Sequence, residues 1–105
     1  MKIISFIAFI LLINPGGEEK INENATVDLY GTVIEDMTGE PIPGASVYFQ
    51  EIDQTIYTDF DGNFALEDLK PGEYNIEVSF ISFEKMEIRK YSILKDSTSL
   101  MVRLH

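Results

Sequence analysis

The chain has 105 residues, of which 18 are acidic and 8 are basic, so its formal net charge is −10 at pH 7. This length allows one domain, and the acidic charge disfavours nucleic acid and anionic lipid as partners. The absence of cysteine excludes thiol catalysis, a cysteine-ligated zinc and a lipid-modified cysteine anchor.

The first residues carry a lysine followed by an apolar run, Ile3 to Ile13. This order is typical of a secretory signal, and the run is shorter than the about 20 residues that span a bilayer. Residues 1–17 are therefore predicted to be a signal peptide. No small-x-small cleavage site is visible, so a short membrane anchor is the alternative, and the membrane would then be reached only through this segment. Residues 18–26 are polar and predict a flexible lead-in.

From residue 27 onward, apolar and polar residues alternate in short segments that turn signals separate. The cleanest case places Tyr74, Ile76, Val78 and Phe80 on one face of a strand. The predicted strands are 27–35, 45–51, 55–58, 62–66, 74–81, 84–91 and 98–104. Seven short strands without a convincing helix predict an all-β sandwich, with the domain at residues 27–105.

The stretch from Thr58 to Phe64 is predicted to be a tight hairpin between the third and fourth strands. Asp61-Gly62 supplies the residues that a two-residue turn needs, since glycine tolerates a positive φ. Phe60 and Phe64 flank the turn, and both are expected to be buried.

The same turn raises the question of a metal site. Asp59, Asp61 and Asn63 place oxygen-bearing side chains at alternate positions, as at the start of an EF-hand loop. That loop needs glycine at its sixth position and glutamate at its twelfth, whereas this chain has Phe64 and Lys70 there. We therefore expect turn-forming residues and no metal ligands. A looser calcium site made by the same three side chains is the alternative.

No constellation in the sequence predicts catalysis. Two carboxylates on one small turn do not form the cleft that glycoside hydrolysis requires. The single histidine, His105, has no evident partner for a zinc site or a catalytic triad. We expect no catalytic residue, no cofactor and no enzymatic activity.

Several motifs in order resemble the carboxypeptidase-regulatory-like domain family. They are Gly31-Thr32-Val33-Ile34, the segment from Gly39 to Val47 that contains Pro43-Gly44, the segment from Thr58 to Phe64, and Leu69-Lys70-Pro71-Gly72-Glu73-Tyr74. The resemblance is greatest to the N-terminal domain of TonB-dependent outer-membrane nutrient importers. It implies a transthyretin-like (prealbumin-like) seven-stranded sandwich with Greek-key connections. The motif residues expected to shape this fold are Gly31, Pro43, Gly44, Asp61, Gly62, Phe64, Pro71 and Gly72.

The resemblance does not import peptidase chemistry, because the catalytic zinc of those enzymes lies in a separate domain. It implies a non-catalytic, exported accessory or protein-interaction module in the periplasm or at the outer membrane of a bacterial envelope. Its partner would be an envelope protein such as a TonB-dependent importer. One alternative is a carbohydrate-binding module that uses outward-facing Tyr30, Tyr48, Tyr57 or Phe83. Another is an N-terminal piece of an importer.

Overall fold

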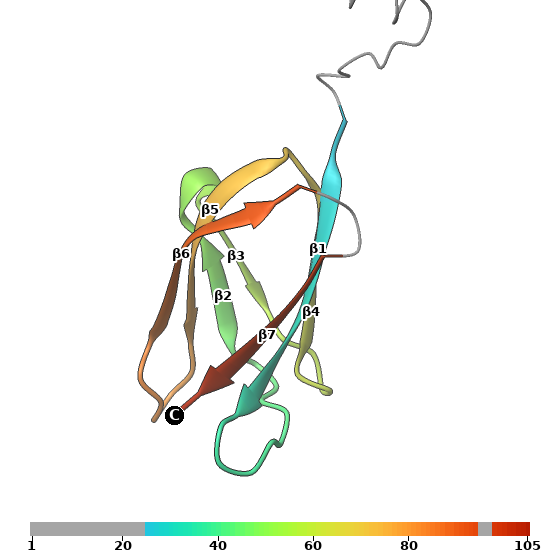
Figure 1. The fold of residues 1–105 in the computed structure, drawn as a ribbon. Helices are drawn as coiled ribbons and strands as arrows, with labels where there is room; N and C mark the ends of the chain where they lie inside the picture. Colours follow the sequence, from blue (N-terminus) through green and yellow to red (C-terminus); the bar gives the residue numbers. More distant parts are fainter. Residues whose placement is uncertain (1–24, 95–97) are drawn as a thin grey trace, which may run out of the picture.

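The computed structural model describes residues 25–94 and 98–105 of the chain, which form seven strands and one short 3-10 turn (Figure 1). The elements are β1 Val27–Glu35, β2 Ser46–Phe49, η1 Gln50–Ile52, β3 Gln54–Tyr57, β4 Asn63–Leu69, β5 Gly72–Ser79, β6 Met86–Ile93 and β7 Thr98–Leu104. The all-β, seven-stranded prediction is confirmed. The predicted signal segment 1–17 and most of the lead-in 18–26 lie outside the described residues.

The strands form a three-stranded sheet of order β4-β1-β7 and a four-stranded sheet of order β3-β2-β5-β6. Central strand β1 pairs antiparallel with β4 and parallel with β7. The pairs of the other sheet are all antiparallel. After β1 the chain crosses to the second sheet for β2 and β3, then returns beside β1 as β4, which is a Greek-key connection.

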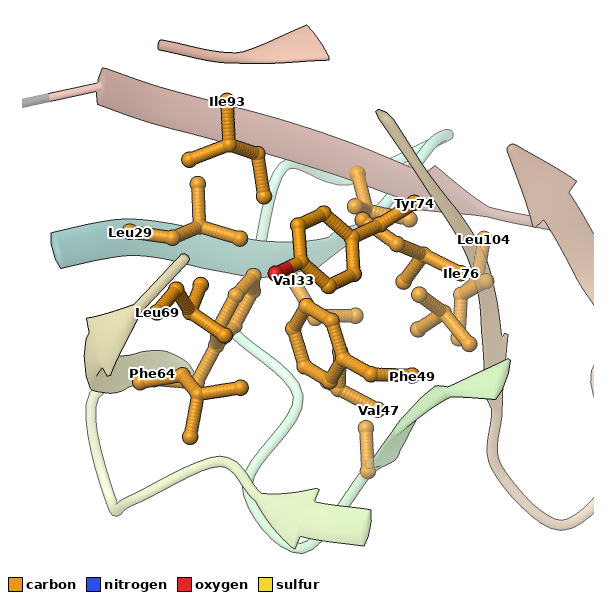
Figure 2. Close-up of a cluster of buried hydrophobic side chains, with 14 of the residues drawn as sticks. Leu29, Val33, Val47, Phe49, Phe64, Leu69, Tyr74, Ile76, Ile93 and Leu104 are labelled. Atoms are coloured by element: carbon orange, nitrogen blue, oxygen red, sulfur yellow. The ribbon is translucent and has the colours of Figure 1, made fainter. Parts of the chain in front are cut away.

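The core lies between the two sheets and follows the predicted alternation. Leu29 and Val33 of β1 face Phe49 of β2 and Ile76 of β5, and all four are essentially inaccessible to solvent (Figure 2). The Phe49 ring meets Tyr74 edge to face, with centroids 6.4 Å apart, a favoured aromatic geometry. Every second side chain of the strands in both sheets therefore points inward, and together these side chains form one hydrophobic core.

Gly31 of β1 makes room for the aromatic ring of Phe64, its pairing partner on the neighbouring strand β4 of the same sheet. A Cβ atom at this position would overlap the Phe64 ring and lie 2.7 Å from the carbonyl oxygen of Leu100. Phe64 is 5% exposed, so its predicted burial is confirmed. The glycine in the middle of β1 therefore marks a close approach between neighbouring strands.

Two bulges share one design. In each, one strand carries an extra residue in the left-handed region, Asp68 in β4 (φ 63°) and Lys90 in β6 (φ 54°). The backbone N–H of that residue donates to a side-chain oxygen of the facing strand: Asp68 to Asp28 Oδ1 at 3.0 Å, and Lys90 to Asn75 Oδ1 at 3.0 Å. A short polar side chain thus satisfies a donor that the ladder leaves unpaired.

A carboxylate adds two hydrogen bonds at the second bulge. We call the group formed by Glu51, Asn75 and Lys90 the clamp around Asn75. Glu51, in η1, accepts the backbone N–H of Asn75 at 2.8 Å and its side-chain amide at 2.6 Å. The bond from the Asn75 backbone lowers the pKa of Glu51 below its ordinary value. Glu51 therefore continues, through its side chain, the pairing with β5 that β2 ends at Phe49.

Strand boundaries differ from the prediction where these irregularities occur. Strand β4 runs to Leu69 rather than to residue 66, because the bulge lets pairing with β1 continue past Asp68. Strand β2 ends at Phe49 rather than at residue 51, since the chain enters the 3-10 turn. The sequence predicted no helix. Among the described residues, this 3-10 turn is the only helical element.

The prediction of a β3–β4 hairpin is wrong, because β3 and β4 belong to different sheets. The segment between them closes through Gly62 N–H to Asp59 O at 2.9 Å and Asp59 N–H to Asn63 O at 2.8 Å. Only Gly62, at φ 77°, is left-handed there, so the loop has three residues and is not the expected two-residue turn. Phe60, expected to be buried, is 93% exposed at the loop tip, since no sheet face lies over it.

Candidate binding surfaces

Asp59, the first predicted calcium ligand, is used by the turn itself. Its Oδ1 accepts the backbone N–H groups of Asp61 and Asn63, each at 2.9 Å. The side-chain oxygen of Asn63 accepts the hydroxyl of Thr32 at 2.7 Å. Within the described residues, no three His, Asp or Glu side chains are grouped to hold a metal ion. A calcium site at Asp59, Asp61 and Asn63 stays an untested alternative.

The turn is fastened to the loop before β2 by Thr58, which is only 6% exposed. Its hydroxyl donates to the carbonyl oxygen of Ile42 at 2.6 Å and accepts the N–H of Ala45 at 2.8 Å. Its backbone also exchanges two bonds of 3.0 Å with this loop, through Gly44 and Ala45. Sequence reasoning missed this side chain, because no periodicity marks a threonine at the end of a strand as buried.

The remaining motif residues shape the connections. Gly62 lies against β1, where a Cβ atom would be 2.7 Å from the carbonyl oxygen of Val33. Pro43 and Gly44 form the turn that leads into β2. Pro71 stands between β4 and β5, and Gly72 opens β5. The Tyr74 hydroxyl donates to Lys70 O at 2.6 Å, which fixes this last turn.

Three connections come together at one end of the sandwich, where β7 also ends (Figure 1). They are β1–β2, β3–β4 and β5–β6, and we call this region the loop end. Each connection presents one large apolar side chain: Met37 is 86% exposed, Phe60 is 93% exposed and Ile81 is 79% exposed. A shallow hollow of about 390 Å³ lies there, lined by Pro43, Gly44, Thr58, Asp59 and Phe60.

The aromatic residues predicted to face outward do not form one surface. Tyr30 is on β1 and Tyr57 is on β3, in different sheets. The Tyr48 hydroxyl donates to Asp53 at 2.9 Å, and this bond raises the pKa of Tyr48. Phe83 packs against the core beside Phe80, with ring centroids 6.2 Å apart.

The C-terminal histidine contacts one acidic side chain. His105 Nε2 lies 3.4 Å from a carboxylate oxygen of Glu84, and both side chains are largely exposed. In the part of the chain that the structure describes, no helix is long and apolar enough to cross a membrane.

Comparison with known proteins agrees with this architecture. A family model described as a CarboxypepD_reg-like domain matches residues 29–103. The chain is 40% identical over 73 residues to the TonB-dependent receptor SusC of Bacteroides thetaiotaomicron, a match that covers 66% of this chain and 7% of that receptor. The chain thus spans a small fraction of the length of this relative.

Two solved structures share the fold. One is a type II cohesin-X-dockerin complex from Acetivibrio cellulolyticus, with a TM-score of 0.60 and 23% identity over 70% of this chain and 52% of that one. The other, described as a putative carbohydrate binding protein from Bacteroides uniformis, has a TM-score of 0.61 and 15% identity over 75% of this chain and 41% of that one. At these identities the likeness concerns the fold alone.

Proposed function

Since the chain belongs to the carboxypeptidase-regulatory-like domain family, we propose that it is a non-catalytic, exported module that binds a protein of the bacterial envelope. The chain is similar to part of the TonB-dependent receptor SusC. This similarity supports a role linked to TonB-dependent nutrient uptake. The apolar N-terminal run, typical of an export signal, supports the same location.

The observation that carries this proposal is that each of the three connections at the loop end exposes one large apolar side chain. Single exposed hydrophobic residues are normal on a protein surface. Here the three large hydrophobic side chains with the greatest exposed fractions, Met37, Phe60 and Ile81, occupy three separate loop tips at one end. Loops held by a rigid sandwich are common positions for binding residues. The loop end therefore offers a partner one large apolar side chain from each of its three connections.

Site-specific cross-linking tests this proposal. A photoreactive phenylalanine analogue at Phe60, in the full chain expressed in a bacterium that carries SusC-type receptors, should capture an outer-membrane protein. The same analogue at Tyr57, which is 66% exposed on β3, is the matched control. Capture at both positions alike, or at neither, would contradict the loop end as the contact surface.

A carbohydrate ligand is the second candidate, and Phe60 favours it. A fully accessible ring next to the carboxylates of Asp59 and Asp61 resembles the combination of a stacking face and hydrogen-bond acceptors that recognises a sugar. Calorimetric titration with a panel of oligosaccharides tests it. Binding should be lost in Phe60→Ala and kept in Tyr57→Ala if the loop end is the sugar site.

A further inference from the structure

Four strands lie at sheet edges, and three of them carry devices that discourage further pairing. An edge strand exposes unpaired backbone groups, which proteins protect by shortness, bulges and charges. Strand β3 has only four residues. Strands β4 and β6 are bent by the bulges at Asp68 and Lys90, and both bulges carry charge.

Strand β7 is neither short nor bulged, and its one charged residue is Arg103. It has seven residues, no proline and no bulge, and it pairs with β1 without a register shift from Leu29↔Thr98 to Glu35↔Leu104. Within residues 25–94 and 98–105, no strand pairs with its outer edge. This edge is therefore a regular template for one more strand.

An apolar groove lies beside this edge, between β7 and β6. It has a volume of about 390 Å³ and is lined by six apolar or aromatic side chains and one charged one: Met86, Ile88, Tyr91, Leu100, Met101, Val102 and Arg103. All of these side chains except Val102 keep some solvent exposure, and Met101 is 55% exposed. The groove on the opposite side of the sandwich, along β4, is lined instead by Glu67, Asp68 and Lys70, among others. Every second side chain of a strand added to β7 would cover the apolar groove.

The charges near this edge specify the added strand. Arg103 stands on the exposed face of β7, and it forms no ion pair with any other described residue. Among the other described lysine and arginine residues, Lys85 and Arg89 pair with Glu77 and Glu87, whereas Lys70 and Lys90 form no described ion pair. An unpaired arginine in a chain of net charge −10 favours an acidic neighbour from outside. A second copy of the chain would bring the same negative charge and is disfavoured.

We propose that the outer edge of β7 binds an extended segment of a partner protein as a fourth strand of this sheet. Side chains of that segment that cover the groove are apolar, and an acidic side chain pairs with Arg103. This site is distinct from the loop end, and its test does not depend on the cross-linking experiment.

The test uses the full chain, isotope-labelled and purified from the envelope of an expressing bacterium. Its probe is an array of short peptides with alternating valines and either acidic or basic residues between them. Acidic members should bind, shift the amide signals from Ser99 to Leu104 and slow their hydrogen exchange. N-methylation of alternate peptide amides should abolish binding, because it removes strand pairing and keeps the side chains.

Charge reversal gives the matched comparison. Arg103→Glu should weaken the acidic peptides by about tenfold, because a repulsion replaces an attraction, and should favour basic peptides. Arg89→Glu, on the neighbouring strand, is the control and should change affinity little. Equal binding of acidic and basic peptides, binding that survives N-methylation, or signal shifts confined to the loop end would overturn the proposal. So would a dimer in sedimentation that disappears in Arg103→Glu, since β7 would then bind a second copy.

Discussion

A few polar side chains form hydrogen bonds with backbone groups that the two sheets leave unpaired. Thr58 satisfies the N–H of Ala45 and the carbonyl of Ile42 inside the protein. Asp28 and Asn75 each accept the amide of a left-handed residue at a bulge. Backbone groups that lose water on folding need such partners, so these side chains stabilise the connections of the sandwich.

Thr58→Val tests this at the most buried of the three positions. Valine keeps the shape and removes both side-chain bonds, which leaves a buried donor and a buried acceptor unpaired. The free energy of unfolding should fall by about 2 kcal/mol, within the usual cost of an unsatisfied buried group. Urea denaturation measures the change. Thr58→Ser keeps the hydroxyl and should lose much less, and equal losses in the two variants would show that packing alone matters.

At the scale of elements, the clamp around Asn75 predicts a pH dependence. The pKa of Glu51 is lowered in the folded protein because its carboxylate accepts the Asn75 N–H. A lowered pKa gives stability that is present above the pKa of the unfolded chain, and it is lost as the pH falls through the folded-state pKa. The contribution should therefore be complete at neutral pH and disappear in acid.

Thermal unfolding of the wild type and of Glu51→Gln over a pH series measures this contribution. The Tm of the variant should be lower at neutral pH, and the difference should shrink as the pH falls below about 4.3, the ordinary pKa of glutamate. Subtracting the Tm of the variant from that of the wild type removes the pH effects of the carboxylates that both proteins contain. A difference that stays constant with pH would mean that the charge of Glu51 has no part in the clamp.

Some strands could be predicted from the sequence to the residue, whereas β5, predicted at 74–81 from the cleanest alternation, runs from Gly72 to Ser79. Strands β1 and β7 begin and end where the pattern does. The end of β4 could not be predicted, because a bulge breaks the period of two and Asp68 favours turns outside sheets as well. The local sequence pattern also does not show that β3 and β4 belong to different sheets, since β4 pairs with β1, which precedes β2 and β3 in the chain.

The candidate surfaces were predictable to a smaller extent. The turn chemistry of Asp59 and Gly62 is local, and the sequence indicates it. The loop end joins Met37, Phe60 and Ile81 from three connections, so it exists only once the topology is known. The free edge of β7 likewise depends on sheet order and not on the residues of β7 alone.

At the scale of the whole molecule, the excess of acidic residues opposes the compact state. With 18 acidic and 8 basic residues, the net repulsion is greatest at low ionic strength. Raising sodium chloride from 0.01 M to 0.15 M shortens the screening length from about 30 Å to about 8 Å, so the Tm should rise over this range. Glu67→Lys, at an exposed position of β4, should raise the Tm at low salt by an amount that salt then removes. A Tm that falls with salt would show that attractive pairs outweigh the repulsion.

The parallel pairing of β1 with β7 has a consequence for how the protein folds. β1 pairs with β7, which lies at the other end of the domain's sequence. Its second partner, β4, also follows β2 and β3 in the chain. Sheets made of such distant contacts close slowly, in about milliseconds to seconds, because the entropy of a large loop is lost before its contacts form. Until β7 pairs with β1, the backbone groups on that edge of β1 have no strand partner. During that interval the chain is most exposed to misassembly.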